Sequence, residues 1–180
     1  MKLLLLMTLF ISVYADVKND MFGLYQNEKY NKACHLGHKY LDKNIRNEEF
    51  ISLYAFSCLK SDFIDRLALP VSLLKFSKEA RSNAAYFSVV LMQKKLLYHS
   101  LVDNYNISKL TLPSTDYVLS KVFDLYAKLG VHERRTLYIF NDEKNPRVSY
   151  KLYLVHDDKL SKMVIEEYFD TISIQRHVYW

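Results

Sequence analysis

Residues 24–41 have the sequence LYQNEKYNKACHLGHKYL, and this stretch decides how the N-terminal part of the chain folds. The pair Asn27-Glu28 is typical of a short polar turn. After the turn, apolar and small residues recur at steps of three and four, which places them on one face of a helix: Tyr30, Ala33, Cys34, Gly37 and Leu41. The pattern predicts a helix over 29–43 that is joined by the turn to a first helix over 17–26.

The helical period continues to about Gly130. It predicts helices over 48–60, 63–76 and 115–129, and a longer element that starts at Ser77 or Ser82 and ends at about Asp103. Pro70 should kink or restart the helix over 63–76, because proline has no N–H to donate. The polar residues 93–95 leave open whether the longer element is one helix or two. Gly130 is suited to end the last helix, since glycine readily adopts a positive φ.

After Gly130 the chain becomes rich in β-branched and aromatic residues, which is typical of strands. Polar turns separate four predicted strands: 136–140, 148–156, 161–169 and 171–180. They form an antiparallel meander of three or four strands, packed on the helices because so small a sheet needs cover. The first two strands are apolar on both faces, which favours central or sandwiched positions. In the last strand the face with Ile172, Ile174, Val178 and Trp180 is predicted to be buried.

The predicted fold class is therefore α+β and mainly α. Antiparallel helical hairpins come first, and a small C-terminal β-meander follows. The predicted organisation is a signal peptide over 1–15, a helical domain over 16–130 and the meander over 131–180.

The first hairpin resembles a tetratricopeptide-type repeat. That family places an aromatic residue and, three positions later, a small residue at the start of its second helix, here Tyr30 and Ala33. Residues 53–74 resemble a degenerate second copy, in which Leu67 stands where the family has alanine, and 84–86 resemble the start of a third. The copies lie about 30 residues apart, near the family's period of about 34. For the first half of the chain, the resemblance implies a protein-binding scaffold with a concave face and no chemistry of its own. Generic packing of helical hairpins is the alternative.

The N-terminus has the features of a bacterial secretory signal peptide. Lys2 gives it a positive start, residues 3–11 are apolar except for Thr8, and small residues precede a predicted cleavage site between Ala15 and Asp16. Nine residues span roughly 13 Å as a helix, which is far short of a ~30 Å hydrocarbon core. An uncleaved anchor and a buried first helix are the alternatives.

The composition excludes several classes of protein. Of the 180 residues, 50% are hydrophobic and 25% are charged, unlike a disordered or collagen-like chain. A formal net charge of +5 without a long basic run does not indicate a nucleic-acid partner, although it permits peripheral contact with an anionic membrane. No later segment approaches the length of a transmembrane helix, so none is predicted in the mature chain. No cofactor is predicted.

The two cysteines are predicted to form a disulfide bond. Cys34 and Cys58 lie on consecutive predicted helices, equally far from the turn at 44–47. Residues equidistant from the turn of an antiparallel hairpin face each other, and disulfides persist in the compartments that exported proteins reach. Two buried, reduced cysteines are one alternative, and an intermolecular bond or a reactive thiol is another.

The histidines give weaker indications. His35 and His38 have a helical spacing at which two side chains can share a metal. They remain weak candidates, since no third ligand lies near them in sequence, and no metal site is predicted. His132-Glu133 and the acids after His156 form acid–histidine pairs in predicted loops. No nucleophile or phosphate-binding motif accompanies them, so no catalytic residue is predicted.

Three further patterns have ordinary interpretations. Glu166-Glu167 is interpreted as one solvent-facing and one rim carboxylate. The sequence Asn106-Ile107-Ser108 is a glycosylation sequon, which matters only in a eukaryotic secretory pathway. The strand that ends at Trp180 resembles the C-terminal signal of outer-membrane barrels, but such a barrel needs at least about eight strands.

These observations predict an exported, periplasmic scaffold for interaction or assembly in a bacterial envelope system, with other envelope proteins as its partners. One alternative is a small periplasmic or secreted enzyme whose site lies between helices and sheet and uses His132, His156 or His177. Another is an outer-membrane-associated component, for which the Trp180 strand is the indication.

Overall fold

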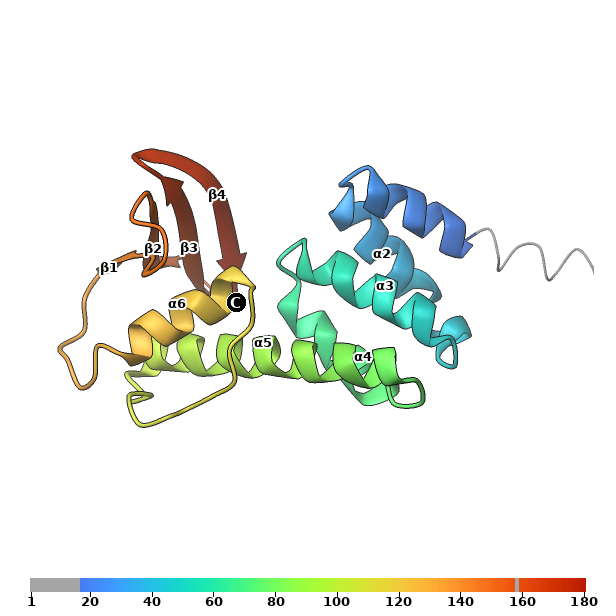
Figure 1. Ribbon diagram of the computed structural model, residues 1–180, viewed down its shortest axis with the longest axis horizontal. Helices are drawn as coiled ribbons and strands as arrows, with labels where there is room; N and C mark the ends of the chain where they lie inside the picture. Colours follow the sequence, from blue (N-terminus) through green and yellow to red (C-terminus); the bar gives the residue numbers. More distant parts are fainter. Residues whose placement is uncertain (1–16, 158) are drawn as a thin grey trace, which may run out of the picture. The chain divides into compact units, whose positions relative to one another are not determined.

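The computed structural model describes residues 17–157 and 159–180. The predicted signal peptide and its cleavage site between Ala15 and Asp16 lie outside these residues. The chain divides into two compact units, Met1–Phe87 (unit 1) and Ser88–Trp180 (unit 2). Helices come first and a four-stranded antiparallel sheet follows, so the fold class is α+β and mainly α, as predicted (Figure 1).

Unit 1 consists of short helices joined by tight turns. Residues 17–26 are helical, as expected. The elements that follow in unit 1 are α2 (Tyr30–Tyr40), η1 (Asp42–Asn44), α3 (Glu48–Leu59), η2 (Ile64–Leu67), α4 (Ala68–Leu73) and the first part of α5 (Lys78–Asp103). Asn47 caps α3, since its side-chain oxygen accepts a hydrogen bond from the Phe50 N–H at 3.1 Å.

Pro70 divides the segment that was predicted to be one helix over 63–76. The segment starts as the 3₁₀ turn η2, and α4 then begins at Ala68. Pro70 is therefore in the first turn of α4, where an α-helix needs no N–H donor. Its carbonyl accepts a hydrogen bond from the Leu74 N–H at 2.9 Å, which closes the short helix.

Helix α5 is continuous, so the polar residues 93–95 do not divide it. The boundary between the units falls inside this helix, between Phe87 and Ser88, whereas the change from helix to strand comes after Gly130. In the part of the chain that the structure describes, every helix is too short or too polar to cross a bilayer.

Unit 2 contains the rest of α5, the helix α6 (Val118–Ala127) and the sheet. Gly130 follows α6 with a φ of +68°, the backbone conformation for which glycine was expected there. The strands pair in the order of the sequence and are β1 (Leu137–Asn141), β2 (Val148–His156), β3 (Ser161–Phe169) and β4 (Ile172–Tyr179).

Helices cover one face of the sheet within unit 2. The ring of Tyr126 on α6 packs edge to face on Tyr138 of β1, with 5.0 Å between the ring centroids. Tyr98 on α5 donates its hydroxyl to the carbonyl of Ser161, at the start of β3, at 2.6 Å. We call this the covered face of the sheet and the opposite one the open face.

The prediction for the buried face of β4 was wrong. Ile172 and Ile174 are 69% and 57% exposed, whereas His177 and Tyr179 are only 7% and 1% exposed. The pairing register shifts along β4, because Gln175 pairs with Glu167 but Ser173 pairs with Tyr168, which leaves Ile174 opposite no residue of β3. After this bulge the pairing with β3 is regular from Gln175 to Tyr179, and the covered face of that stretch carries His177 and Tyr179 instead of the predicted Val178.

Strand β1 also differs from its prediction. It is an edge strand rather than a central one, because only β2 pairs with it. Tyr138 and Phe140 point to the covered face and are buried, whereas Leu137 and Ile139 remain exposed. Apolar residues on both faces of a strand therefore did not indicate burial on both faces here.

Candidate functional site

A disulfide bond joins α2 and α3 in unit 1, in agreement with the predicted pairing. The sulfur atoms of Cys34 on α2 and Cys58 on α3 are 2.07 Å apart, and their Cα atoms are 4.8 Å apart. Both residues are fully buried. The Arg66 guanidinium also approaches the bond, with Nη1 at 3.3 Å from Cys34 Sγ.

The same two helices approach each other closely at Gly37. A Cβ atom at this position would lie 2.6 Å from Tyr54 Cδ2 and 2.8 Å from Met21 Sδ. The small residue therefore lets α2 contact both the preceding helix and α3. Neither the close contact nor the disulfide leaves a reactive group exposed, so both are structural features.

An open groove in unit 1 lies between two turns, the one before α3 and the one before α5. It has a volume of about 800 Å³. We call it the turn groove, and its lining residues are Lys43, Asn44, Arg46, Asn47, Glu48, Glu49, Phe76, Ser77 and Glu79.

Glu48 holds the two sides of the turn groove together. Its carboxylate accepts hydrogen bonds from three consecutive backbone N–H groups, those of Lys75 at 2.7 Å, Phe76 at 2.6 Å and Ser77 at 2.8 Å. The bond from Phe76, helped by those from Ser77 and Lys75 and opposed by partial desolvation, lowers the pKa of Glu48 to about 2. The ionised carboxylate thus fixes the turn before α5.

Glu48→Gln is expected to lower the melting temperature at pH 7, because a neutral amide accepts these N–H bonds less strongly. The carboxyl group has a pKa of about 4.3 in the unfolded chain and about 2 in the folded one. A lowered folded pKa stabilises the fold above the unfolded pKa, and this stabilisation is lost as the pH falls towards 2. The difference in melting temperature between wild type and variant should therefore shrink between pH 4.5 and 2.

Circular dichroism melts of both proteins across this pH range measure the effect. Glu79→Gln is the matched control, since Glu79 lines the same groove but accepts none of the three N–H bonds. Equal melting temperatures for wild type and Glu48→Gln at pH 7 would contradict the role assigned to Glu48.

Phe76 is an exposed side chain on a fixed backbone. It is 72% exposed. Its carbonyl accepts a hydrogen bond from the Arg81 guanidinium at 2.6 Å, while its N–H is held by Glu48. The next residue, Ser77, caps α5 by accepting the Ala80 N–H on its hydroxyl at 3.0 Å. The groove therefore presents an exposed apolar side chain on a backbone that hydrogen bonds hold in place.

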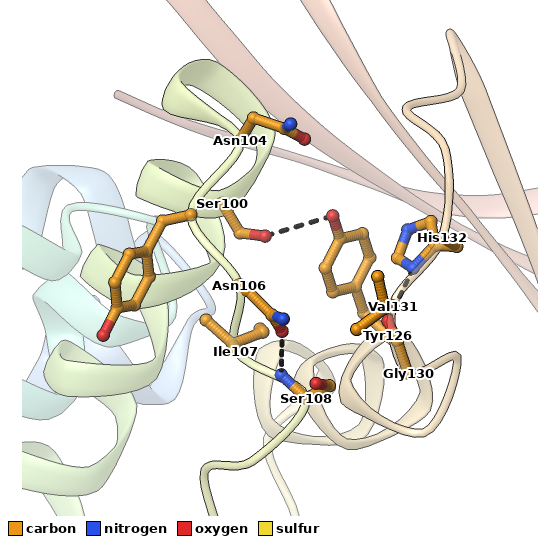
Figure 2. A pocket seen from close by; sticks show the side chains of 10 residues that line it. Ser100, Asn104, Asn106, Ile107, Ser108, Tyr126, Gly130, Val131 and His132 are labelled. Carbon is orange, nitrogen blue, oxygen red and sulfur yellow. Dashed lines mark hydrogen bonds between the residues drawn. The ribbon is translucent and has the colours of Figure 1, made fainter.

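A smaller, polar pocket of about 120 Å³ lies in unit 2, between the end of α5 and the segment after α6 (Figure 2). Ser100 donates its hydroxyl hydrogen bond to the Tyr126 hydroxyl at 3.1 Å. His132 contacts the Gly130 carbonyl through Nδ1 at 2.9 Å and the Tyr138 hydroxyl through Nε2 at 3.3 Å. Burial, with a contribution from Tyr138, raises the pKa of Tyr126 to about 12, so its phenol stays protonated at neutral pH. The pocket holds hydrogen-bonding groups but no assembled nucleophile and base.

The three histidines of the enzyme alternative have three different surroundings. His132 lies in the pocket of Figure 2. His156 Nδ1 is 2.8 Å from the Ser161 hydroxyl at the start of β3. His177 Nε2 is 3.0 Å from Glu167 Oε1 on the covered face. Among the residues described, these contacts do not gather two of the three histidines with an acid.

The pair His177–Glu167 is a contact that sequence reasoning missed. Residues of β3 and β4 that lie diagonally across the ladder can touch. Glu167 pairs directly with Gln175, two residues before His177. Its neighbour Glu166 is on the open face, where burial would raise its pKa but hydrogen bonds from Tyr168 and Tyr153 lower it overall. The faces on which Glu166 and Glu167 lie follow from the register of β3 against β4, which the sequence alone does not give.

The weak metal candidates have aromatic neighbours. His35 packs edge to face on Phe63, with ring centroids 5.5 Å apart. His38 stacks on Tyr54, whose hydroxyl is 3.4 Å from His38 Nδ1. Residues 17–157 and 159–180 contain no group of three or more histidine, cysteine or acidic side chains placed to hold a metal ion.

The two remaining sequence patterns are in unit 2. Asn106 lines the pocket of Figure 2, and its side-chain oxygen accepts the Ser108 N–H at 2.9 Å. Trp180 is 49% exposed. Comparison of the chain with protein-family models, with curated proteins and with solved structures finds no match in any of the three.

Proposed function

We propose that the chain is an exported, periplasmic protein that binds another envelope protein through the turn groove and has no chemistry of its own. The observation that carries this proposal is Phe76, which is 72% exposed while hydrogen bonds from both sides hold its backbone. Aromatic side chains are typical centres of protein–protein binding energy, and a backbone that is already fixed loses less conformational freedom on binding. The charged rim around Phe76 is typical of such interfaces.

Two further features support export and a scaffold role. A disulfide bond between Cys34 and Cys58 suits an oxidising compartment, and the predicted signal peptide would direct the chain there. The resemblance of the first hairpin to tetratricopeptide-type repeats points in the same direction, since Ala33 and Gly37 are fully buried where α2 meets its neighbours.

The proposal is tested by placing a photo-crosslinking amino acid at position 76 of the full-length chain, expressed in its source bacterium. We expect one discrete adduct in the periplasmic fraction, carrying a chain that begins at Asp16. Position 69 is the matched control, because Leu69 on α4 is 48% exposed and does not line the groove. With the partner identified, Phe76→Ala should weaken binding about tenfold or more, and Leu69→Ala should leave it unchanged.

Two results would refute the proposal. Equal adducts at positions 76 and 69, or none at 76, would exclude the turn groove as the binding site. A chain that retains Met1 and stays in the cytosol would exclude export.

A further inference from the structure

A separate cavity in unit 2 is lined by two consecutive arginines. It has a volume of about 340 Å³ and lies where the segment before β1 meets the end of β2. We call it the arginine cavity. The lining residues that matter here are Arg134, Arg135, Thr136, His156, Leu101 and Leu154.

Neither arginine of this cavity forms an ion pair with an acidic side chain of the described residues. Arg135 lies over the Tyr138 ring, with its guanidinium carbon 6.0 Å from the centroid. Its backbone N–H donates to the Tyr138 hydroxyl at 3.1 Å. The buried tyrosine thus fixes the segment that carries both guanidinium groups.

The acids on the neighbouring strands have other partners. Asp157 pairs with Lys162 at 2.7 Å. Glu166 accepts hydrogen bonds from Tyr153 and Tyr168, each at 2.9 Å. Since these two carboxylates are engaged and neither arginine is ion-paired, the two guanidinium groups remain available for an anion from solution.

The donor set suits a phosphate better than a carboxylate. One guanidinium can saturate both oxygens of a carboxylate with a bidentate pair, so a second one next to it is not needed. A phosphate monoester has three terminal oxygens, which two guanidinium groups and the Thr136 hydroxyl can share. Leu101 and Leu154 add an apolar wall to the cavity, and such a wall would contact an apolar group attached to the phosphate.

We propose that the arginine cavity binds a phosphate monoester with an apolar group next to the phosphate. This site is distinct from the turn groove, because it is lined only by residues of unit 2. The ligand is either a free phosphate monoester or phosphatidic acid, a phospholipid whose headgroup is a phosphate monoester, so both sources offer the same three terminal oxygens.

The test uses the purified mature chain and phenyl phosphate in isothermal titration calorimetry, with benzoate as the carboxylate probe. We expect phenyl phosphate to bind more tightly than benzoate. The double variant Arg134→Gln/Arg135→Gln should weaken phenyl phosphate binding at least about tenfold, since it removes both charge-assisted contacts. Lys109→Gln/Lys144→Gln removes the same charge from exposed positions outside the cavity and should change binding less than about twofold.

Sedimentation with phosphatidylcholine vesicles, with or without phosphatidic acid, distinguishes the two sources. Binding only to the anionic vesicles, lost in the arginine variant, identifies a lipid headgroup. Binding of phenyl phosphate without vesicle binding identifies a free ester. The proposal is overturned if wild type binds neither probe, if benzoate binds as tightly as phenyl phosphate, or if the lysine variant loses binding as the arginine variant does. Phe76→Ala should leave every one of these results unchanged. A failure of the turn-groove proposal can therefore be distinguished from a failure of the arginine-cavity proposal.

Discussion

Gly37→Leu is expected to destabilise unit 1 by about 3 kcal/mol, the upper end of the usual cost of overpacking. Even a Cβ atom at this position would lie 2.6 Å from Tyr54 Cδ2, 2.8 Å from Met21 Sδ and 2.9 Å from Tyr54 Cβ. Tyr54 and Met21 are 2% and 0% exposed, so neither side chain has free space to move into. The added atoms must therefore push α2 away from its neighbours.

Urea unfolding followed by circular dichroism measures this loss. Gly37→Ala and Gly23→Ala make a matched pair, because both put the same methyl group into a helix, where alanine is favoured over glycine by about 1 kcal/mol. No atom lies within 4 Å of a Cβ built on Gly23. Gly23→Ala should therefore stabilise the fold and Gly37→Ala should destabilise it. Stabilisation by both would show that α2 has room at Gly37.

Cys34→Ala/Cys58→Ala is expected to lower the free energy of unfolding by about 3 kcal/mol, because the disulfide closes a loop whose ends are 24 residues apart. The closed loop contains the turn between α2 and α3, so its loss also frees the hairpin that carries Glu48. In the unfolded chain the bond removes conformations that the variant regains.

Urea unfolding with and without dithiothreitol measures this contribution. The reductant should destabilise wild type and leave the double variant unchanged, which separates the disulfide from general effects of the reagent. A thiol assay on the denatured, unreduced protein should find no free thiol. Two titratable thiols in the native exported protein would refute the disulfide, and with it one of the two arguments for an oxidising compartment.

Much of the architecture could be predicted from local pattern. Strands β2 and β3 have the predicted bounds, because polar turn residues flank each run of β-branched and aromatic residues. The cysteine pairing followed from equal distances to a turn. The buried face of β4 was predicted wrongly, because hydrophobicity favoured the face with Val178, whereas the register with β3 places His177 and Tyr179 on the covered face.

The candidate sites were not predictable, because they depend on contacts between distant residues. In the sequence, Glu48 is an ordinary acidic residue of the first turn of a helix. The backbone N–H groups that it binds lie 27 to 29 residues later in the chain. Arg134-Arg135 reads as a short basic doublet. Whether these arginines can bind an external anion depends on which nearby carboxylates bind other side chains. Those contacts are set by the register of β2 against β3.

Helix α5 has one more consequence, for any attempt to divide the molecule. The boundary between Phe87 and Ser88 falls inside the hydrogen-bonded helix α5. A fragment that starts at Ser88 would begin with four N–H groups that have lost their carbonyl partners. The fragment that ends at Phe87 would end with four carbonyl groups that have lost their N–H partners. Either half, prepared alone for binding studies, should therefore retain α5 over its whole length.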